Sequence, residues 1–322
     1  MKKGKKNTVD IPNKVKSNIF KDFAYDIKHN KWLMMMCIPA IVFFIVFSYF
    51  PMFGVIMAFQ DYKVTTGFLG SDFVGLKNFE FLFTDDFAGV AFNTLYLNIL
   101  FIAATMFCAI IIAILLSEIK NKYFKKVSQS IVILPHFISW TVVAMIIEAF
   151  ISSEQGVINK AIMALGGESI NFYQNAAVWP LLLTILRIWH GAGFDSIVYL
   201  AAITGIDQEI YEAARVDGAT RVQCIRHLTL PLLKNTAVLL LIMAVGKIFN
   251  GDFGMIYAIV GSNTQLYATT DVIDTYVYRS LTEISNVSMP AAVSFFQSCI
   301  GFVLVYITNA ISRKVNPESA VF

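Results

Sequence analysis

A cluster of ionisable and aromatic residues stands inside a long apolar stretch of the sequence. Its members follow the i, i+3, i+4, i+7 spacing of one helical face, with a fifth residue at its border: Arg187, His190, Gly191, Phe194 and Asp195. Hydrogen-bond donors beside an aromatic ring and a glycine suit a ligand with hydroxyl groups and an apolar ring face, such as a sugar. Ionisable residues in an apolar span generally face a protein interior or a wet cavity. We therefore predict that these residues line a polar path through the segment.

A second polar interruption lies in a later apolar run, where the sequence reads KIFNGDFG. Asparagine, aspartate and glycine placed so closely are poor in an uninterrupted apolar helix, and interrupted spans often mark a binding site. The candidate path residues here are Phe249, Asn250, Asp252 and Phe253. A structural alternative stays open, in which Arg187 pairs with Asp252 or Asp195 pairs with Lys247. The two roles are compatible.

Groupings typical of catalysis do not stand out in the sequence. His136 and Glu148 are single residues, of a kind that is more often structural, and the four cysteines have no metal-site or disulfide spacing. Gly246 and Lys247 are followed by isoleucine, so they do not form a phosphate-binding loop. We predict no catalytic residue, no metal and no cofactor in this chain.

The elements that must position these residues are membrane-spanning helices. The chain of 322 residues is 57% hydrophobic and 15% charged, whereas soluble domains carry about 25% charged residues. Six apolar runs are long enough to cross a bilayer as helices: 32–59, 89–116, 127–151, 176–204, 236–260 and 289–311. A soluble all-helical core is excluded, because six such runs leave too little polar surface. The predicted fold is an all-α membrane protein of six transmembrane helices.

Basic residues predict the orientation, because lysine and arginine remain on the cytoplasmic side. Nine of the 25 precede the first run, and further groups lie in the loops after the second and fourth runs. Both termini are therefore expected in the cytoplasm. The predicted organisation is a basic N-terminal segment (1–31), a transmembrane domain (32–311) and a tail (312–322). Attraction to anionic lipid explains the basic segment more simply than nucleic-acid binding.

The loop between the fourth and fifth runs, about 205–234, is polar and long enough for two short helices. Asp207 is a plausible N-cap, with Glu209 early in the first turn. Gly218 permits a tight change of direction. An amphipathic connector lying on the membrane surface would show the same pattern, so these features alone leave the role of the loop open.

The string EAARVDGA, followed by LPLL, resembles the EAA signature of ABC importer permeases. The resemblance implies that this loop is a coupling helix, which docks in a cleft of a cytoplasmic ATPase. The residues that it assigns to this contact are Tyr211, Glu212, Ala213, Ala214, Asp217 and Gly218. Cys224 departs from the pattern, since many relatives carry a bulky apolar or aromatic residue there.

The segments PMFGVIMAFQDY, FVGLKNF and DVIDTYVYR look like parts of oligosaccharide-type permeases, and the LplB-like branch is the most similar. This resemblance implies a MalF/MetI-like permease fold in the bacterial cytoplasmic membrane and import of sugars or oligosaccharides. The implied partners are a second homologous permease subunit, a cytoplasmic ABC ATPase dimer that holds ATP and magnesium, and an extracytoplasmic solute-binding protein. An ion-coupled secondary transporter is the alternative, but it would need paired repeats with matching broken spans.

Overall fold

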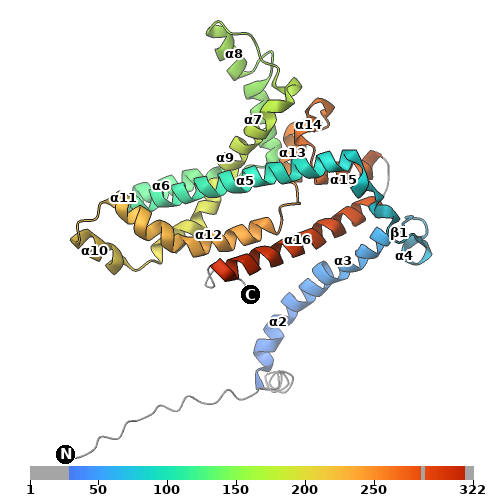
Figure 1. Ribbon diagram of the computed structural model, residues 1–322, viewed down its shortest axis with the longest axis horizontal. Coiled ribbons are helices and arrows are strands. Elements are labelled where there is room, and N and C mark those ends of the chain that lie inside the picture. The colour runs from blue at the N-terminus through green and yellow to red at the C-terminus, as the bar shows by residue number, and fades with distance from the viewer. Residues whose placement is uncertain (1–28, 284–286, 316–322) are drawn as a thin grey trace, which may run out of the picture. The chain divides into compact units, whose positions relative to one another are not determined.

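The computed structural model describes residues 29–283 and 287–315 (Figure 1). The chain divides into a unit that ends at Val55 and a unit that begins at Ile56. The predicted N-terminal segment 1–31 and the tail 312–322 fall largely outside the described residues. In the described part, five helices are long and apolar enough to cross a membrane, or six if one bent pair is a single span.

The first unit contains one helical stretch. It comprises α2 (Lys31–Phe44), a π-helical turn (Ile45–Tyr49) and α3 (Phe50–Met52), and it continues into a 3-10 turn (Phe53–Phe59). Pro51 lacks an N–H group, and its ring would crowd the carbonyl four residues earlier in a regular helix. The π-helical turn that precedes it widens the helix and accommodates the ring. The first predicted span is therefore a helix with one widened turn.

A small hairpin and a pair of long helices begin the second unit. Strand β1 (Gln60–Asp61) pairs antiparallel with β2 (Asp72–Phe73), with α4 (Gly67–Gly70) between them, and a 3-10 segment (Lys77–Phe83) follows. Helix α5 (Asp85–Glu118) then forms its most extensive contact with α9 (Trp179–Thr204). Apolar side chains such as Leu97 and Leu183 fill that interface.

The third predicted span, 127–151, is a bent pair of helices and not one continuous helix. The chain forms α6 (Lys122–Ile133), a 3-10 turn (Leu134–Phe137) and α7 (Trp140–Ile151), with a bend of 95°. Pro135 lies in the turn, and the Ser139 side chain caps α7 by accepting from the Val142 N–H group at 3.4 Å. The proline interrupts the first helix and the serine caps the start of a second one, so the helix cannot continue straight.

Short elements connect α7 to α9. They are α8 (Val157–Ala164) and the 3-10 turns Phe172–Gln174 and Ala176–Val178. Trp179, the first residue of α9, is fully buried, and its indole N–H donates to the Phe172 carbonyl at 2.8 Å. This contact fixes the start of α9, which matches the fourth predicted run.

The fifth predicted span, 236–260, is displaced in the structure. One continuous helical stretch runs through α11 (Arg221–Cys224), a π-helical turn (Ile225–Thr229) and α12 (Leu230–Val245). Its π-helical turn precedes Pro231 just as the earlier one precedes Pro51. Hence the second half of the loop 205–234 is the beginning of the long helix, not a separate short helix as predicted.

The chain breaks after Val245 and resumes as α13 (Phe253–Val260). A 3-10 turn (Thr264–Leu266), α14 (Tyr267–Thr270) and α15 (Ile273–Glu283) follow, and α16 (Ser288–Val315) is the last described helix. Helices α12 and α16 lie side by side (Figure 1). Their close approach involves Gly246 and Gly301.

Candidate functional site

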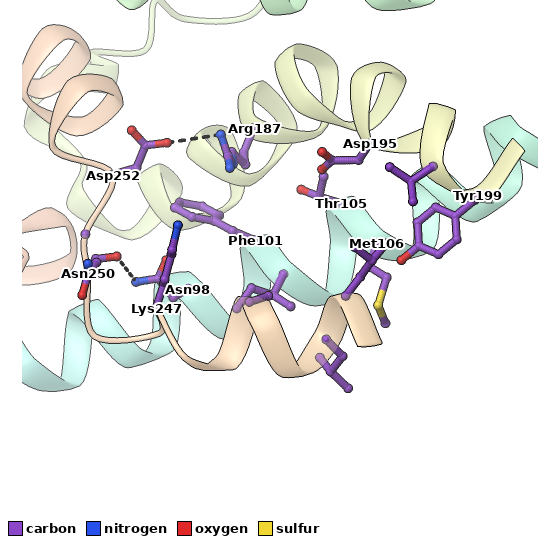
Figure 2. A pocket seen from close by; sticks show the side chains of 16 residues that line it. Asn98, Phe101, Thr105, Met106, Arg187, Asp195, Tyr199, Lys247, Asn250 and Asp252 are labelled. Carbon is purple, nitrogen blue, oxygen red and sulfur yellow. Dashed lines mark hydrogen bonds and ion pairs between the residues drawn. The ribbon is translucent and has the colours of Figure 1, made fainter. Parts of the chain in front are cut away.

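A cavity of about 390 Å³ lies between α5, α9, α12 and the break that follows α12. Figure 2 shows charged and amide side chains at its wall together with apolar ones. Four of the residues predicted from the sequence line it: Arg187, Asp195, Asn250 and Asp252. The structure therefore brings together candidates from two runs that are far apart in the sequence. Their role as a substrate path remains a prediction.

The break between α12 and α13 exposes backbone groups that a continuous helix would pair, and neighbouring side chains satisfy them. The Asn98 amide of α5 donates to the carbonyls of Ile248 at 3.0 Å and Asn250 at 3.1 Å. Gln297 of α16 donates to the Phe249 carbonyl at 2.8 Å. The break is thus held in one conformation by two amide side chains from different helices.

Gly251 and Asp274 complete this anchoring. The Gly251 N–H group donates to the Asp274 carboxylate, and a Cβ atom at this glycine would lie 2.7 Å from a Val272 methyl carbon. Burial raises the pKa of Asp274, although the hydrogen bond from Gly251 acts in the opposite direction. A glycine is needed at this position because α15 approaches the backbone so closely.

An ion pair joins the two predicted clusters across the cavity. Arg187 Nη1 lies 3.2 Å from Asp252 Oδ2, and the two side chains are 36% and 26% exposed. Asp252 also caps α13, since its Oδ1 accepts from the Met255 N–H group at 3.2 Å. The pairing of Arg187 with Asp252 that the sequence left open is therefore present, and it ties α9 to the start of α13.

Lys247 and Asp195 both line the cavity, but they do not form the other pair that the sequence allowed. No carboxylate oxygen of the described residues lies within 4.0 Å of the Lys247 ammonium group. Figure 2 shows Lys247 near Arg187 and Phe101, whereas Asp195 lies toward Thr105 and Tyr199. The end of the cavity at Arg187 and Lys247 carries two cations and the single carboxylate of Asp252, and we call it the cationic end.

The remaining α9 candidates do not line this cavity. His190 is buried, and its Nε2 lies 3.0 Å from the Ile138 carbonyl oxygen. Its ring stacks on Trp140 with centroids 4.0 Å apart, and Phe194 stacks on His136 at 4.1 Å. Gly191 lies between them on the same helix. These rings pack α9 against the bend between α6 and α7.

Phe249 and Phe253, the two aromatic candidates of the break, also lie elsewhere. Phe249 packs in a cluster with Phe296 of α16. Phe253 stacks on Tyr257 at 5.0 Å and lies 5.1 Å from the ring of Tyr278. Nothing in the geometry assigns them a ligand, so their predicted contact with sugar stays a prediction.

Sequence reasoning did not single out the residues that α5 contributes to the cavity. Asn98, Phe101 and Thr105 line it at i, i+3 and i+7. The signal available was Asn98, a polar residue within the apolar run 89–116. Polar residues inside a span are costly unless they are paired, so Asn98 was a candidate for a packing or binding role.

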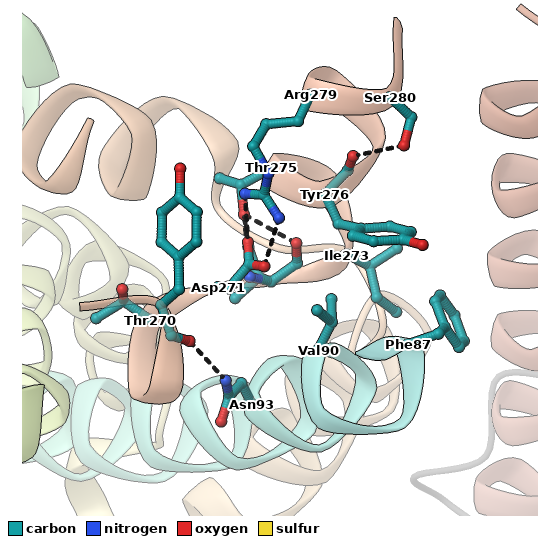
Figure 3. A network of polar contacts seen from close by, with 12 residues as sticks. Phe87, Val90, Asn93, Thr270, Asp271, Ile273, Thr275, Tyr276, Arg279 and Ser280 are labelled. Carbon is teal, nitrogen blue, oxygen red and sulfur yellow. Dashed lines mark hydrogen bonds and ion pairs between the residues drawn. The ribbon is translucent and has the colours of Figure 1, made fainter. Parts of the chain in front are cut away.

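A polar network joins α5 to α14 and α15 (Figure 3). The Arg279 guanidinium donates two hydrogen bonds to the buried Asp271 carboxylate, at 2.8 and 2.6 Å, and lies 4.4 Å from the centre of the Tyr267 ring. The hydrogen bonds to Asp271 raise the pKa of Arg279 above its usual value. Thr94 of α5 accepts from the Ile273 N–H group at 2.9 Å. The sequence segment DVIDTYVYR is thus closed by an ion pair between its two ends.

The loop after α9 forms helix α10 (Gln208–Val216), which carries most of the residues assigned to ATPase coupling. Asp207 caps it as predicted, since its carboxylate accepts from the Glu209 N–H group at 3.0 Å. At the other end the Ala219 N–H group donates to the Ala214 carbonyl at 2.9 Å, and Gly218 has a φ of +82°. This is the Schellman arrangement, in which glycine adopts a left-handed conformation that ends the helix.

The surface of this loop suits a protein contact. Val216 is 88% exposed and Val222 is 73% exposed. A surface hollow of about 320 Å³ is lined in part by Ala214, Asp217 and Gly218. The Tyr211 hydroxyl lies 2.9 Å from that of Thr229 and fastens α10 to the long helix. The loop thus presents two exposed apolar side chains and a hollow, and Tyr211 holds it against the long helix.

Comparisons with known proteins agree with one another. The family model described as binding-protein-dependent transport system inner membrane component matches residues 106–318. The chain is 38% identical to the polygalacturonan/rhamnogalacturonan transport system permease protein YteP of Bacillus subtilis (strain 168), over 89% of each chain. It is 37% identical to protein LplB of the same organism, over 91% of this chain and 92% of that one.

A solved structure is similar in fold as well as in sequence. It is a bacterial alginate ABC transporter in complex with a periplasmic protein that holds an alginate pentasaccharide. A chain of that transporter matches with a TM-score of 0.80 and 35% identity, over 90% of this chain and 97% of that chain.

Proposed function

Because the chain belongs to the family of inner membrane components of binding-protein-dependent transport systems, we propose that it is a permease subunit of an ATP-driven importer of oligosaccharides. The family provides the membrane component of an ABC transporter and is not catalytic, and ATP hydrolysis belongs to a separate subunit. The chain supplies part of the membrane path and the contact through which an ATPase moves it.

The observation that carries this proposal is the combination of one loop and one cavity. The Gly218 turn and the capped helix α10 form a rigid contact for an ATPase. The cavity lies between the helices that flank this loop in the sequence, α9 and α12. Motion of α10 is transmitted to the α12 wall, because Tyr211 joins it to the helical stretch that begins at Arg221.

The oligosaccharide substrate is supported by the relatives. YteP is named for polygalacturonan and rhamnogalacturonan transport, and the similar solved transporter imports alginate. The cavity itself offers the amide, carboxylate and cationic groups of Asn250, Asp252 and Lys247 for sugar hydroxyls.

The complete importer in this proposal contains two permease subunits, and this chain, one of the two, has six spans. The bent pair α6 and α7 counts as one of the six, and both termini face the cytoplasm of the bacterial cell. A homologous second permease, a pair of ATPase subunits and an extracytoplasmic solute-binding protein complete it. The periplasmic protein in the solved alginate transporter supports the last of these partners.

The test is recovery of the ATPase subunits with an affinity-tagged Glu212→Lys chain, purified from membranes in mild detergent. Glu212 is exposed on α10, and a reversed charge in a docked interface commonly costs several kcal/mol. Glu154→Lys, at an exposed position between α7 and α8, is the control with the same charge change. We expect ATPase recovery to fall only for Glu212→Lys. Equal recovery and equal ATP turnover in both variants would refute the docking role.

A further inference from the structure

We propose that the cationic end of the cavity binds a carboxylate of the substrate, so that the importer selects oligosaccharides containing acidic sugar units (uronates). This inference rests on the proposed function and identifies the substrate class of the same cavity. The residue that makes the selection is Lys247, at the end of α12.

The charges at this end do not balance within the described residues. Arg187 and Lys247 supply two cations, and Asp252 supplies one carboxylate, which lies 3.2 Å from Arg187. Asp195 lines the same cavity but forms no ion pair with Lys247, and it lies toward Thr105 at the other end (Figure 2). One positive charge therefore faces the cavity without a carboxylate partner in the described part of the chain.

A cation that lines a cavity within a membrane protein is costly unless water or an anion compensates it. For a path that accepts only neutral sugars, an amide or a hydroxyl would supply the hydrogen bonds without that cost. An ammonium group adds a long-range attraction for a carboxylate and a charge-assisted hydrogen bond, which is about twice as strong as a neutral one. The residue type at 247 thus favours an anionic ligand.

The surroundings of Lys247 leave it available for a ligand. The nearby Asn98 amide is occupied by the carbonyls of Thr94, Ile248 and Asn250, so it holds the backbone of the break. Lys247 has no corresponding bond from its side chain to the protein among the described residues, and its side chain is exposed. The neighbouring Phe101 adds apolar surface to the wall. A uronate presents a carboxylate and an apolar ring face, and both features have a counterpart here.

The experiment uses the assembled importer in proteoliposomes, with its solute-binding protein at saturation. The probes are trigalacturonate and trimannuronate, each compared with its methyl ester, which keeps the sugar skeleton and removes the charge. The variants are Lys247→Met, Lys247→Arg and, as a matched control, Lys160→Met on α8, where an exposed lysine lies away from the cavity. Uptake, substrate-stimulated ATP turnover and the yield of assembled complex are measured together.

We expect uptake of at least one acidic probe to fall about ten- to hundredfold in Lys247→Met, which is the loss expected for a hydrogen bond to a charged group. Lys247→Arg and Lys160→Met should retain it, and uptake of the ester should change little.

A loss that is equal for acid and ester overturns the inference, as does no loss at all. If Lys247→Met lowers only the yield of complex, Lys247 pairs with a carboxylate of another subunit and the inference is wrong. Transport of the esters without the acids also overturns it and leaves the proposed function intact. If no oligosaccharide is taken up, the proposed function itself fails, and this inference with it.

Discussion

Gly193→Ala should separate two helices whose contact sets the geometry of the bend between α6 and α7. A Cβ atom at Gly193 would lie 2.0 Å from the Val132 carbonyl oxygen of α6, whereas Cβ atoms essentially never come closer than 3.0 Å to such an atom. The obstacle is backbone, so no rotamer change can relieve it, and the helices must move apart by about 1 Å. The rings of His136 and Phe194, stacked at 4.1 Å across the same contact, would lose their alignment.

The free-energy cost follows from this geometry. Overpacking of a core costs about 1–3 kcal/mol, and a backbone neighbour places Gly193→Ala at the upper end. Replacing glycine by alanine in a helix itself stabilises the folded protein by about 0.5–1 kcal/mol. Gly191→Ala gains the same stabilisation on the same helix, but its Cβ atom would meet only a Thr105 methyl carbon, at an ordinary contact distance of 3.8 Å. We expect Gly193→Ala to be about 2 kcal/mol less stable than the wild-type protein and Gly191→Ala to be at least as stable as wild type.

The assay is reversible unfolding of the purified chain in detergent micelles, followed by tryptophan fluorescence for both variants and the wild type. Trp140 stacks on His190 beside the contact and reports on its geometry. Equal unfolding free energies for the two variants would show that α6 and α9 are not in close contact at Gly193, and would refute the reasoning.

Three further predictions concern the cavity, the loop and α15. Asp252→Ala should lower the stability of the complex by about 1–2 kcal/mol, because a partly exposed ion pair lies between surface and buried pairs in strength. The double variant with Arg187→Ala should regain most of that stability. Recovery of sugar uptake in the double variant would mean that the pair is structural only. Gly218→Ala should reduce ATPase recovery from detergent extracts, since a φ of +82° costs a residue with a Cβ atom about 1–2 kcal/mol. Gly205→Ala, at a φ of −82°, should not reduce it. Equal recovery for the two variants would contradict the role of the turn. The raised pKa of Asp274 means that the folded state binds a proton more readily than the unfolded state, so thermal stability should gain a contribution as the pH falls through the raised pKa toward the ordinary value of 3.8. Asp274→Asn should lack that contribution in melting curves measured across the acidic range, and an unchanged pH profile would show that Asp274 does not titrate in this way.

Features that depend on nearby residues were predictable from the sequence. The apolar runs predict the helices by length and composition. The string EAARVDGA points to the family, and the comparisons confirm that membership. Asp207 and Gly218 were predicted as cap and turn, and the structure confirms both. Capping and the left-handed glycine are decided within a few residues of the chain, so the local sequence is sufficient to specify them.

Features that depend on distant residues were decided only by the tertiary structure. The sequence allowed Asp252 or Lys247 to pair with a charge on α9, and of these two pairs the structure contains that of Arg187 with Asp252. The helix ends at Val245 because Asn98 and Gln297, from other helices, accommodate the carbonyls that follow it. In each case the unpaired backbone groups or charges find their partners more than forty residues away, and the apolar pattern of a single run carries no information about such partners.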